Sequence, residues 1–196
     1  MVSLKDIIIY GRCLIYHSYV WLCPILLIPA LLRPEKPRSV LAMTATVSGK
    51  KYNWPMRAAF PVTVHLLFFR EDQVLLLRRF NTGYADGQYS VPAGHLDGGE
   101  TVIAAAAREA AEETGVRIAP EDVIFSSVMH RRDGDERVDF FVRLRHWQGE
   151  PTNTEPDKCH ELRWVRLGDL PENIIPYVRK AIQNHRDGIK FDEFGW

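Results

Sequence analysis

Two pairs of apolar runs, each interrupted by a short polar turn, dominate the middle of the chain. Residues 60–69 and 73–79 are rich in Val, Leu and Phe, and three polar residues separate them. Residues 123–132 and 137–145 flank an Asp-Gly dipeptide at 133–134, which is favoured in hairpin turns. We therefore predict four strands in two pairs.

Helical patterns follow each pair of strands. We predict one helix over about residues 100–114 and a closing helix over 171–187, in which Pro176 favours a late start or a kink. The remaining segments are predicted to be two short strands, at 89–92 and 161–167, and two polar loops, at 81–88 and 147–160.

The amino end carries a separate apolar stretch at residues 14–32, with basic residues on both sides. Its length allows a membrane anchor, but Pro24 and Pro29 interrupt it and the flanking charges give no clear orientation. A signal peptide is a weaker alternative, because the apolar region is long and interrupted. The third interpretation, which we favour, is that residues 1–42 are an extension outside the fold and that the working domain covers 43–196.

Charge and cysteine content narrow the class of protein. With 196 residues and a formal net charge of zero, the chain has no basic surplus for holding a nucleic-acid polymer, so a small nucleotide is the better expected partner. Cys13, Cys23 and Cys159 show no metal-ligand spacing and leave an odd thiol, which indicates a reducing compartment. We expect a cytoplasmic location, with anchoring through 14–32 as the alternative.

The candidate chemistry lies between Gly94 and Val116. The chain there follows the pattern G-x5-E-x7-R-E-U-x-E-E-x-G-U, where U is a bulky aliphatic residue, except that Ala110 is small. At about 100° per residue, three glutamates fall on one helix face and repel one another, and a bound cation would reverse that repulsion. These glutamates are Glu109, Glu112 and Glu113.

Alone, such an acidic run is usually a solvated helix face. The glycine-rich loop before it favours a functional site, because Gly94 allows a close turn with its carbonyl free to face a metal, and Gly115 is placed to cap the helix. Carboxylate oxygens are hard ligands that suit Mg²⁺ or Mn²⁺.

The pattern resembles the signature of the Nudix (MutT-like) hydrolases. The resemblance implies an α/β fold, a mixed β-sheet sandwiched between helices (α/β/α), and a metal-dependent pyrophosphohydrolase activity. It implies that Glu109, Glu112 and Glu113 bind the metal, that Glu109 also serves as the catalytic base, and that Arg108 orients the carboxylates. For Glu100, a favourable charge at the helix amino end and direct ligation are equally open.

The same resemblance suggests residues on the substrate side. Arg79, at the end of a strand, would contact phosphates, with an ordinary exposed strand end as the alternative. Glu155, in the late loop, is a candidate additional metal ligand, and Asp157 would read a base edge; a solvated loop acid is the alternative. His65 lies in an apolar strand and is expected to be a core or edge histidine.

These features predict a hydrolase of nucleoside diphosphate-linked substrates, with a (deoxy)nucleoside triphosphate cleaved to monophosphate and pyrophosphate as the leading case. Removal of damaged nucleotides is one role within it. ADP-ribose or nucleotide-sugar hydrolysis is the enzyme alternative, and a non-catalytic nucleotide-binding module is the other. The aromatic terminus at 191–196 is expected to dock on its own domain or on a second copy, so a homodimer is also open.

Overall fold

The structure is a computed structural model that describes residues 8–10, 13–15, 43–47, 50–54 and 58–196, with side chains described from residue 58 onward. Its contacts divide the chain into two compact units, Met1–Met56 and Arg57–Trp196, and each is treated by itself.

The first unit contains two short antiparallel pairs of strands. β1 (Ile8–Tyr10) pairs with β2 (Cys13–Ile15), and β3 (Met43–Val47) pairs with β4 (Lys50–Trp54). The anchor, signal and extension hypotheses concern a segment that falls largely outside the described residues, and the domain start at residue 43 remains a prediction. No helix in the described part of the chain is both long enough and apolar enough to cross a membrane.

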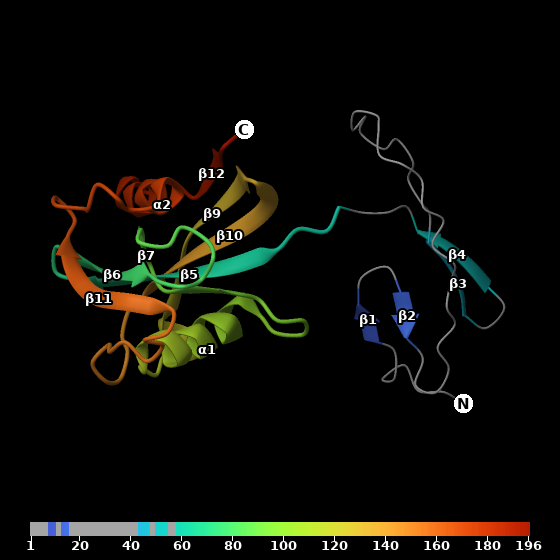
Figure 1. The fold of residues 1–196 in the computed structure, drawn as a ribbon, viewed down its shortest axis with the longest axis horizontal. Helices are drawn as coiled ribbons and strands as arrows, with labels where there is room; N and C mark the ends of the chain where they lie inside the picture. Colours follow the sequence, from blue (N-terminus) through green and yellow to red (C-terminus); the bar gives the residue numbers. More distant parts are fainter. Residues whose placement is uncertain (1–7, 11–12, 16–42, 48–49, 55–57) are drawn as a thin grey trace. The chain divides into compact units, whose positions relative to one another are not determined.

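A mixed sheet forms the centre of the second unit (Figure 1). Its strands run in the order β11-β6-β5-β10-β9-β12, with β7 paired to β6 and β8 paired to β5. The β5–β10 and β9–β12 pairings are parallel, and the other pairings are antiparallel. The strands are β5 (Val62–Arg70), β6 (Gln73–Arg79), β7 (Tyr89–Ser90), β8 (Ala93–His95), β9 (Val123–Asp133), β10 (Asp135–Leu144), β11 (Cys159–Arg166) and β12 (Phe191–Phe194).

The sheet divides beside β5. β5 and β6 pair only next to their turn, at Phe69↔Val74 and Arg70↔Gln73. Beyond the turn β6 pairs with β7 instead, while the other end of β5 pairs with β8 between Thr63↔His95 and His65↔Ala93. This division places the glycine-rich loop next to the middle of the sheet.

Two helices cover opposite faces of the sheet (Figure 1). α1 (Val102–Thr114) begins after Thr101, whose hydroxyl accepts from the Ala104 amide, and ends at Gly115 in the left-handed conformation at φ 70°. α2 (Pro176–Asp187) begins at its proline, as expected from the sequence. A short 3₁₀ helix, η2 (Pro120–Asp122), leads into β9.

Alternating residues of β5 supply both halves of the core. Val64, Leu66 and Phe68 pack with the buried alanines of α1, whereas Leu67 packs with the apolar face of α2. Small residues at α1 positions 105, 106 and 110 are fully buried, so the helix lies against the sheet through short side chains. The predicted α/β/α arrangement is confirmed.

The carboxyl terminus docks on its own domain through backbone pairing. β12 runs parallel to β9, and the indole of Trp196 donates to the His130 carbonyl at 3.1 Å. Phe191 and Trp196 nevertheless stay 60% exposed. A homodimer remains a prediction.

Candidate active site

The acidic face of α1 lies against the short strand β8. Gly94 in β8 packs so closely on the helix that a β-carbon there would overlap the carboxylate of Glu109. The need for glycine at this position is therefore steric, because any side chain would displace an acid of the cluster.

Arg108 connects the acids to the loop before the helix. Its guanidinium donates to Glu109 Oε1 at 2.7 Å, to Glu112 Oε2 at 3.0 Å and to Glu100 Oε1 at 2.8 Å, and also to the His95 carbonyl at 3.0 Å. The hydrogen bonds that Arg108 donates to Glu100 in particular raise the pKa of Arg108, and the same contact lowers the pKa of Glu100. Arg108 thus contacts three carboxylates, among them Glu100, and its role in orienting the others stays a prediction.

Glu109 and Glu113 carry charge that the protein only partly neutralises. Burial raises the pKa of Glu113 to about 8, with smaller contributions from Glu109 and Glu155, against one hydrogen bond from the Ala93 amide at 2.8 Å. Burial also raises the pKa of Glu109, although the guanidinium of Arg108 opposes the shift. Ionising both acids in this site is therefore costly without a cation.

The late loop brings a fourth carboxylate to the same place. The Thr152 amide donates to the Thr114 carbonyl at 3.0 Å, and the Thr154 hydroxyl donates to the Glu112 carbonyl at 2.5 Å, which fixes the loop to the end of α1. Glu155 follows directly and lines the cleft, paired with Lys158 at 2.8 Å.

The donor set fits a hard divalent cation. Several glutamates converge from one helix and one loop, and burial raises the pKa of Glu113, so a bound cation would favour its charged form. Among residues 58–196 no three acid, histidine or cysteine side chains already form a closed metal-binding group. Arg108 instead holds two of the carboxylates.

The two predicted substrate residues have different surroundings. Arg79 lines the cleft and donates to the Tyr84 carbonyl at 2.8 Å and to the Thr82 hydroxyl at 2.9 Å. Within the described part of the chain it has no carboxylate partner, so its charge is available to an anion. Asp157 is exposed and is not among the residues that line the cleft, so its role as a base reader stays a prediction.

A cleft of about 630 Å³ joins these groups and extends past them. It is also lined by buried polar residues that the sequence did not assign to the site: Thr63, His65, Arg131 and Tyr177. The available signal was the pair of polar residues two positions apart in the otherwise apolar β5. A second cavity of about 520 Å³, beside α2, holds none of the predicted site residues.

His65 is buried, as the sequence indicated, and its ring stacks on Phe141 with centroids 4.6 Å apart. Behind it, the fully buried Asp139 accepts from Arg131 at 2.5 Å. Burial alone would raise the pKa of Asp139, but the contacts with His65 and Arg131 lower it to about 2. A matched pair of charges, Arg131 and Asp139, therefore lies behind His65.

Comparison with known sequences decides the family. The sequence pattern described as NUDIX domain matches residues 59–185, which is more than half of the chain. The chain belongs to the Nudix family.

Individual relatives agree with this assignment. The Nudix chain is 28% identical over 143 residues to phosphatase NudJ of Escherichia coli strain K12, a match that covers 69% of this chain and 92% of that protein. The MutT NUDIX hydrolase of Burkholderia pseudomallei is 27% identical, with a TM-score of 0.60 over 65% of this chain and 98% of that one. The MutT protein of Methanosarcina mazei Go1 shares the fold at 19% identity, with a TM-score of 0.58 over 67% of this chain and 96% of that one.

Membership carries a coarse activity. The protein is a Nudix hydrolase, an enzyme that acts on phosphoric anhydrides, and specifically on nucleoside diphosphate derivatives. Nudix hydrolases act on small nucleotide substrates and generally use a divalent metal such as Mg²⁺.

Proposed function

We propose that this enzyme is a Mg²⁺-dependent (or Mn²⁺-dependent) pyrophosphohydrolase that cleaves a (deoxy)nucleoside triphosphate to the monophosphate and pyrophosphate. The observation that carries the proposal is the cleft itself, which combines incompletely neutralised carboxylates with the unpaired guanidinium of Arg79. Cations at one end and an arginine nearby suit a polyphosphate chain.

Glu109, Glu112, Glu113 and Glu155 would hold the metal, together with the carbonyl of Gly94. When bound, the cation would neutralise phosphate oxygens and lower the pKa of an attacking water. Glu109 would accept the proton of that water, a role that its buried position and raised pKa favour. Arg108 would keep Glu109 and Glu112 in place, since it bonds to both.

Two alternatives keep specific support. ADP-ribose hydrolysis requires the same acids, and a fold neighbour described as a bifunctional NMN adenylyltransferase/ADP ribose pyrophosphatase, complexed with AMP and a manganese ion, matches with a TM-score of 0.53 at 19% identity. A phosphatase activity is favoured by the name of the NudJ relative. A non-catalytic binding module is disfavoured, because every acid of the Nudix pattern between Gly94 and Val116 is retained.

The test is product analysis with the full chain. Nucleoside triphosphates, oxidised nucleotides, ADP-ribose and nucleotide sugars are incubated with Mg²⁺ or with EDTA, and monophosphate, pyrophosphate and orthophosphate are quantified separately. We expect Mg²⁺-dependent release of pyrophosphate from a triphosphate. Orthophosphate release would support the phosphatase alternative, and cleavage confined to ADP-ribose or nucleotide sugars would overturn the triphosphate assignment.

A further inference from the structure

The cavity beside α2 is separate from the catalytic cleft. Its volume of about 520 Å³ lies within the range of roughly 300–1,000 Å³ that small-molecule sites occupy, and it shares no lining residue with the cleft. On β5 the cleft is lined by His65 and the cavity by Phe69, about 13 Å further along the strand, and the fully buried Leu67 lies between them. A molecule in this cavity would therefore be distinct from the substrate.

Part of the cavity wall is apolar. Phe69, Leu167 and Leu170 are partly buried and pack against the core cluster to which Ile182 belongs, and all four side chains line the cavity. Because removal of apolar surface from water is favourable, this part of the wall suits an apolar or aromatic group of a ligand.

Arginines supply the charged part of the wall. Arg143 comes from β10, whereas Arg179 and Arg186 lie seven residues apart on α2, close to two helical turns, so they share one face of that helix. All three line the cavity, and Glu71 is the one acid among its lining residues. Three positive charges against one negative charge leave a formal excess of two positive charges, which favours an anion as the ligand.

Two of these arginines have no internal counterion. Within residues 58–196 neither Arg143 nor Arg179 forms an ion pair, although Arg179 donates to the Pro171 carbonyl at 2.6 Å. Both side chains are half-buried, whereas Arg186 is exposed and its Nε lies 3.5 Å from Asp187 Oδ1. Partly buried guanidiniums without a countercharge are suited to a charge-assisted bond with a bound anion.

His185 lines the same cavity and adds no charge to it. Its ring stacks on Phe69 with centroids 4.7 Å apart, and its Nδ1 lies 2.8 Å from Ser126 Oγ. Burial lowers the pKa of His185, and the positive charges of Arg143 and Lys190 lower it further. The electrostatic environment of the ring is therefore positive, in agreement with the excess of arginines.

We propose that this cavity is a second ligand site, which binds a small organic phosphate monoester with its phosphate on Arg143 and Arg179 and its apolar or aromatic body against Phe69 and the two leucines. A phosphate monoester carries a charge of about −1.5 to −2 at pH 7, which matches the excess positive charge better than a single carboxylate does. Guanidiniums bind phosphate through paired hydrogen bonds. The inference goes beyond the proposed function, since that function uses no residue of this cavity.

The test uses phenylphosphonate, an analogue of a phosphate monoester whose carbon–phosphorus bond resists hydrolysis. It is titrated into the full chain in EDTA at about pH 8, above the second pKa of the phosphonate, and binding is followed by NMR up to about 10 mM. Binding should saturate and shift the methyl signals of Leu167, Leu170 and Ile182. It should be about tenfold tighter than that of methylphosphonate, which lacks the ring, or of benzoate, which carries one charge.

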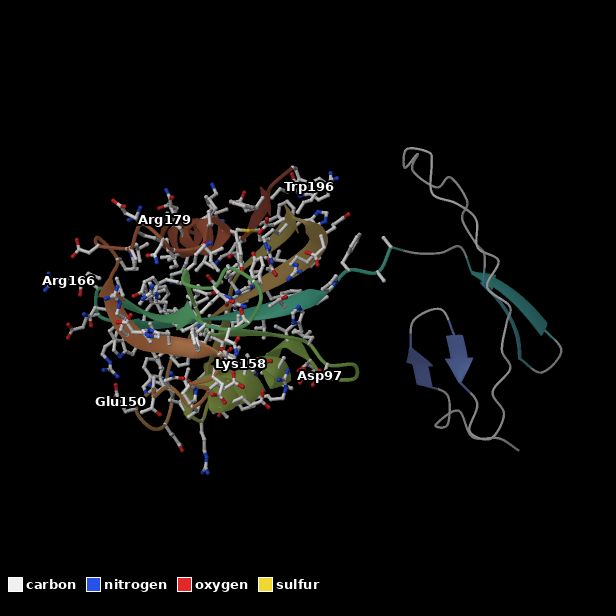
Figure 2. All side chains as sticks on the ribbon, in the orientation of Figure 1. Asp97, Glu150, Lys158, Arg166, Arg179 and Trp196 are labelled. Carbon is white, nitrogen blue, oxygen red and sulfur yellow. The ribbon has the colours of Figure 1, made fainter. Side chains whose placement is uncertain are left out.

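Variants locate the binding site. Arg143→Gln and Arg179→Gln, in two different elements, should each weaken phenylphosphonate binding by about tenfold, because each removes a charge-assisted hydrogen bond. Arg166→Gln is the matched control, because it removes an exposed arginine, labelled in Figure 2, that precedes Leu167 in the sequence but does not line the cavity. Arg79→Gln, in the catalytic cleft, should leave this binding unchanged. Circular dichroism verifies the fold of each variant.

The inference is overturned if phenylphosphonate does not bind saturably, or if benzoate or methylphosphonate binds as tightly. It is also overturned if Arg166→Gln or Arg79→Gln weakens binding as much as the cavity variants do. The failure of the proposed function has a different signature, an absence of Mg²⁺-dependent hydrolysis, whereas these titrations contain no metal and measure no turnover.

Discussion

Two carboxyls, one in the cleft and one behind it, bury charge in opposite ways. In the cleft, burial raises the pKa of Glu113 to about 8, whereas behind His65 the pKa of Asp139 falls to about 2. Asp139 accepts from the guanidinium of Arg131, whereas Glu113 accepts from the Ala93 amide and forms no ion pair within residues 58–196. A buried acid with an internal counterion stabilises a finished structure, and one without a counterion indicates that something else must supply it.

The strongest test of this contrast is Glu113→Gln. The substitution removes a charge and little volume, so Mg²⁺-dependent turnover should fall by about a thousandfold while the fold is kept. Steady-state hydrolysis and circular dichroism measure the two properties. Glu121→Gln, at an exposed acid of η2, is the control, and substantial turnover by Glu113→Gln would contradict the metal assignment.

Asp139→Asn should have its main effect on stability. It removes the buried countercharge of the Arg131 guanidinium and leaves only the half-exposed carboxylate of Asp133 at 3.5 Å, which costs about 3–5 kcal/mol. Urea denaturation measures the loss. Asp135→Asn breaks the exposed pair with Arg137 instead and should cost less than about 1 kcal/mol; equal losses in the two variants would refute the role assigned to Asp139.

Arg79→Gln should weaken substrate binding. The unpaired guanidinium would contribute a charge-assisted hydrogen bond of about 1.5–3 kcal/mol to a phosphate, so KM for a triphosphate should rise by about tenfold or more. Arg166→Gln, at an exposed strand end labelled in Figure 2, is the matched control. An unchanged KM would return Arg79 to the status of an ordinary strand end.

A further effect is on the stability of the metal-free protein. Because the folded pKa of Glu113 lies above its ordinary value of 4.5, its contribution is fully present below about pH 4.5 and is lost as pH rises to about 8. In EDTA, Glu113→Gln should therefore have a higher Tm than wild type at pH 8. The expected rise is roughly 2–4 °C for each kcal/mol of unfolding free energy that the charged Glu113 costs the wild type. Thermal scans at pH 5 and pH 8 check this, and a lower melting point for the variant at pH 8 would reverse the sign.

Local patterns in the sequence were sufficient for most of the fold. The apolar runs and the turn residues between them gave β5, β6, β9 and β10, and Pro176 marked the start of α2, because neighbouring residues determine strands and helix starts. The helix α1 was also predicted. It begins at Val102, two residues later than expected, because Thr101 is its capping residue.

The site was only half predictable. The acids of α1 lie within five residues of one another, so their convergence follows from helix geometry alone. The buried polar residues of the cleft are different. Thr63, Arg131 and Tyr177 come together only through the parallel pairing of β5 with β10 and the packing of α2. Parallel register is not encoded in any short segment, and Arg131 looked like an ordinary residue near a turn.

The bonds between the late loop and α1 have a further consequence for how the chain tolerates length changes. Thr152 and Thr154 donate hydrogen bonds to the last carbonyls of α1, and Glu155 follows them directly. Insertions at the exposed residues 149–150 can bulge into solvent without moving these bonds, whereas Gln148 is held by backbone hydrogen bonds with Arg117. An insertion between Thr154 and Glu155 would instead move the Glu155 carboxylate away from the acids of α1. The loop can therefore lengthen before Thr152 but not after Thr154.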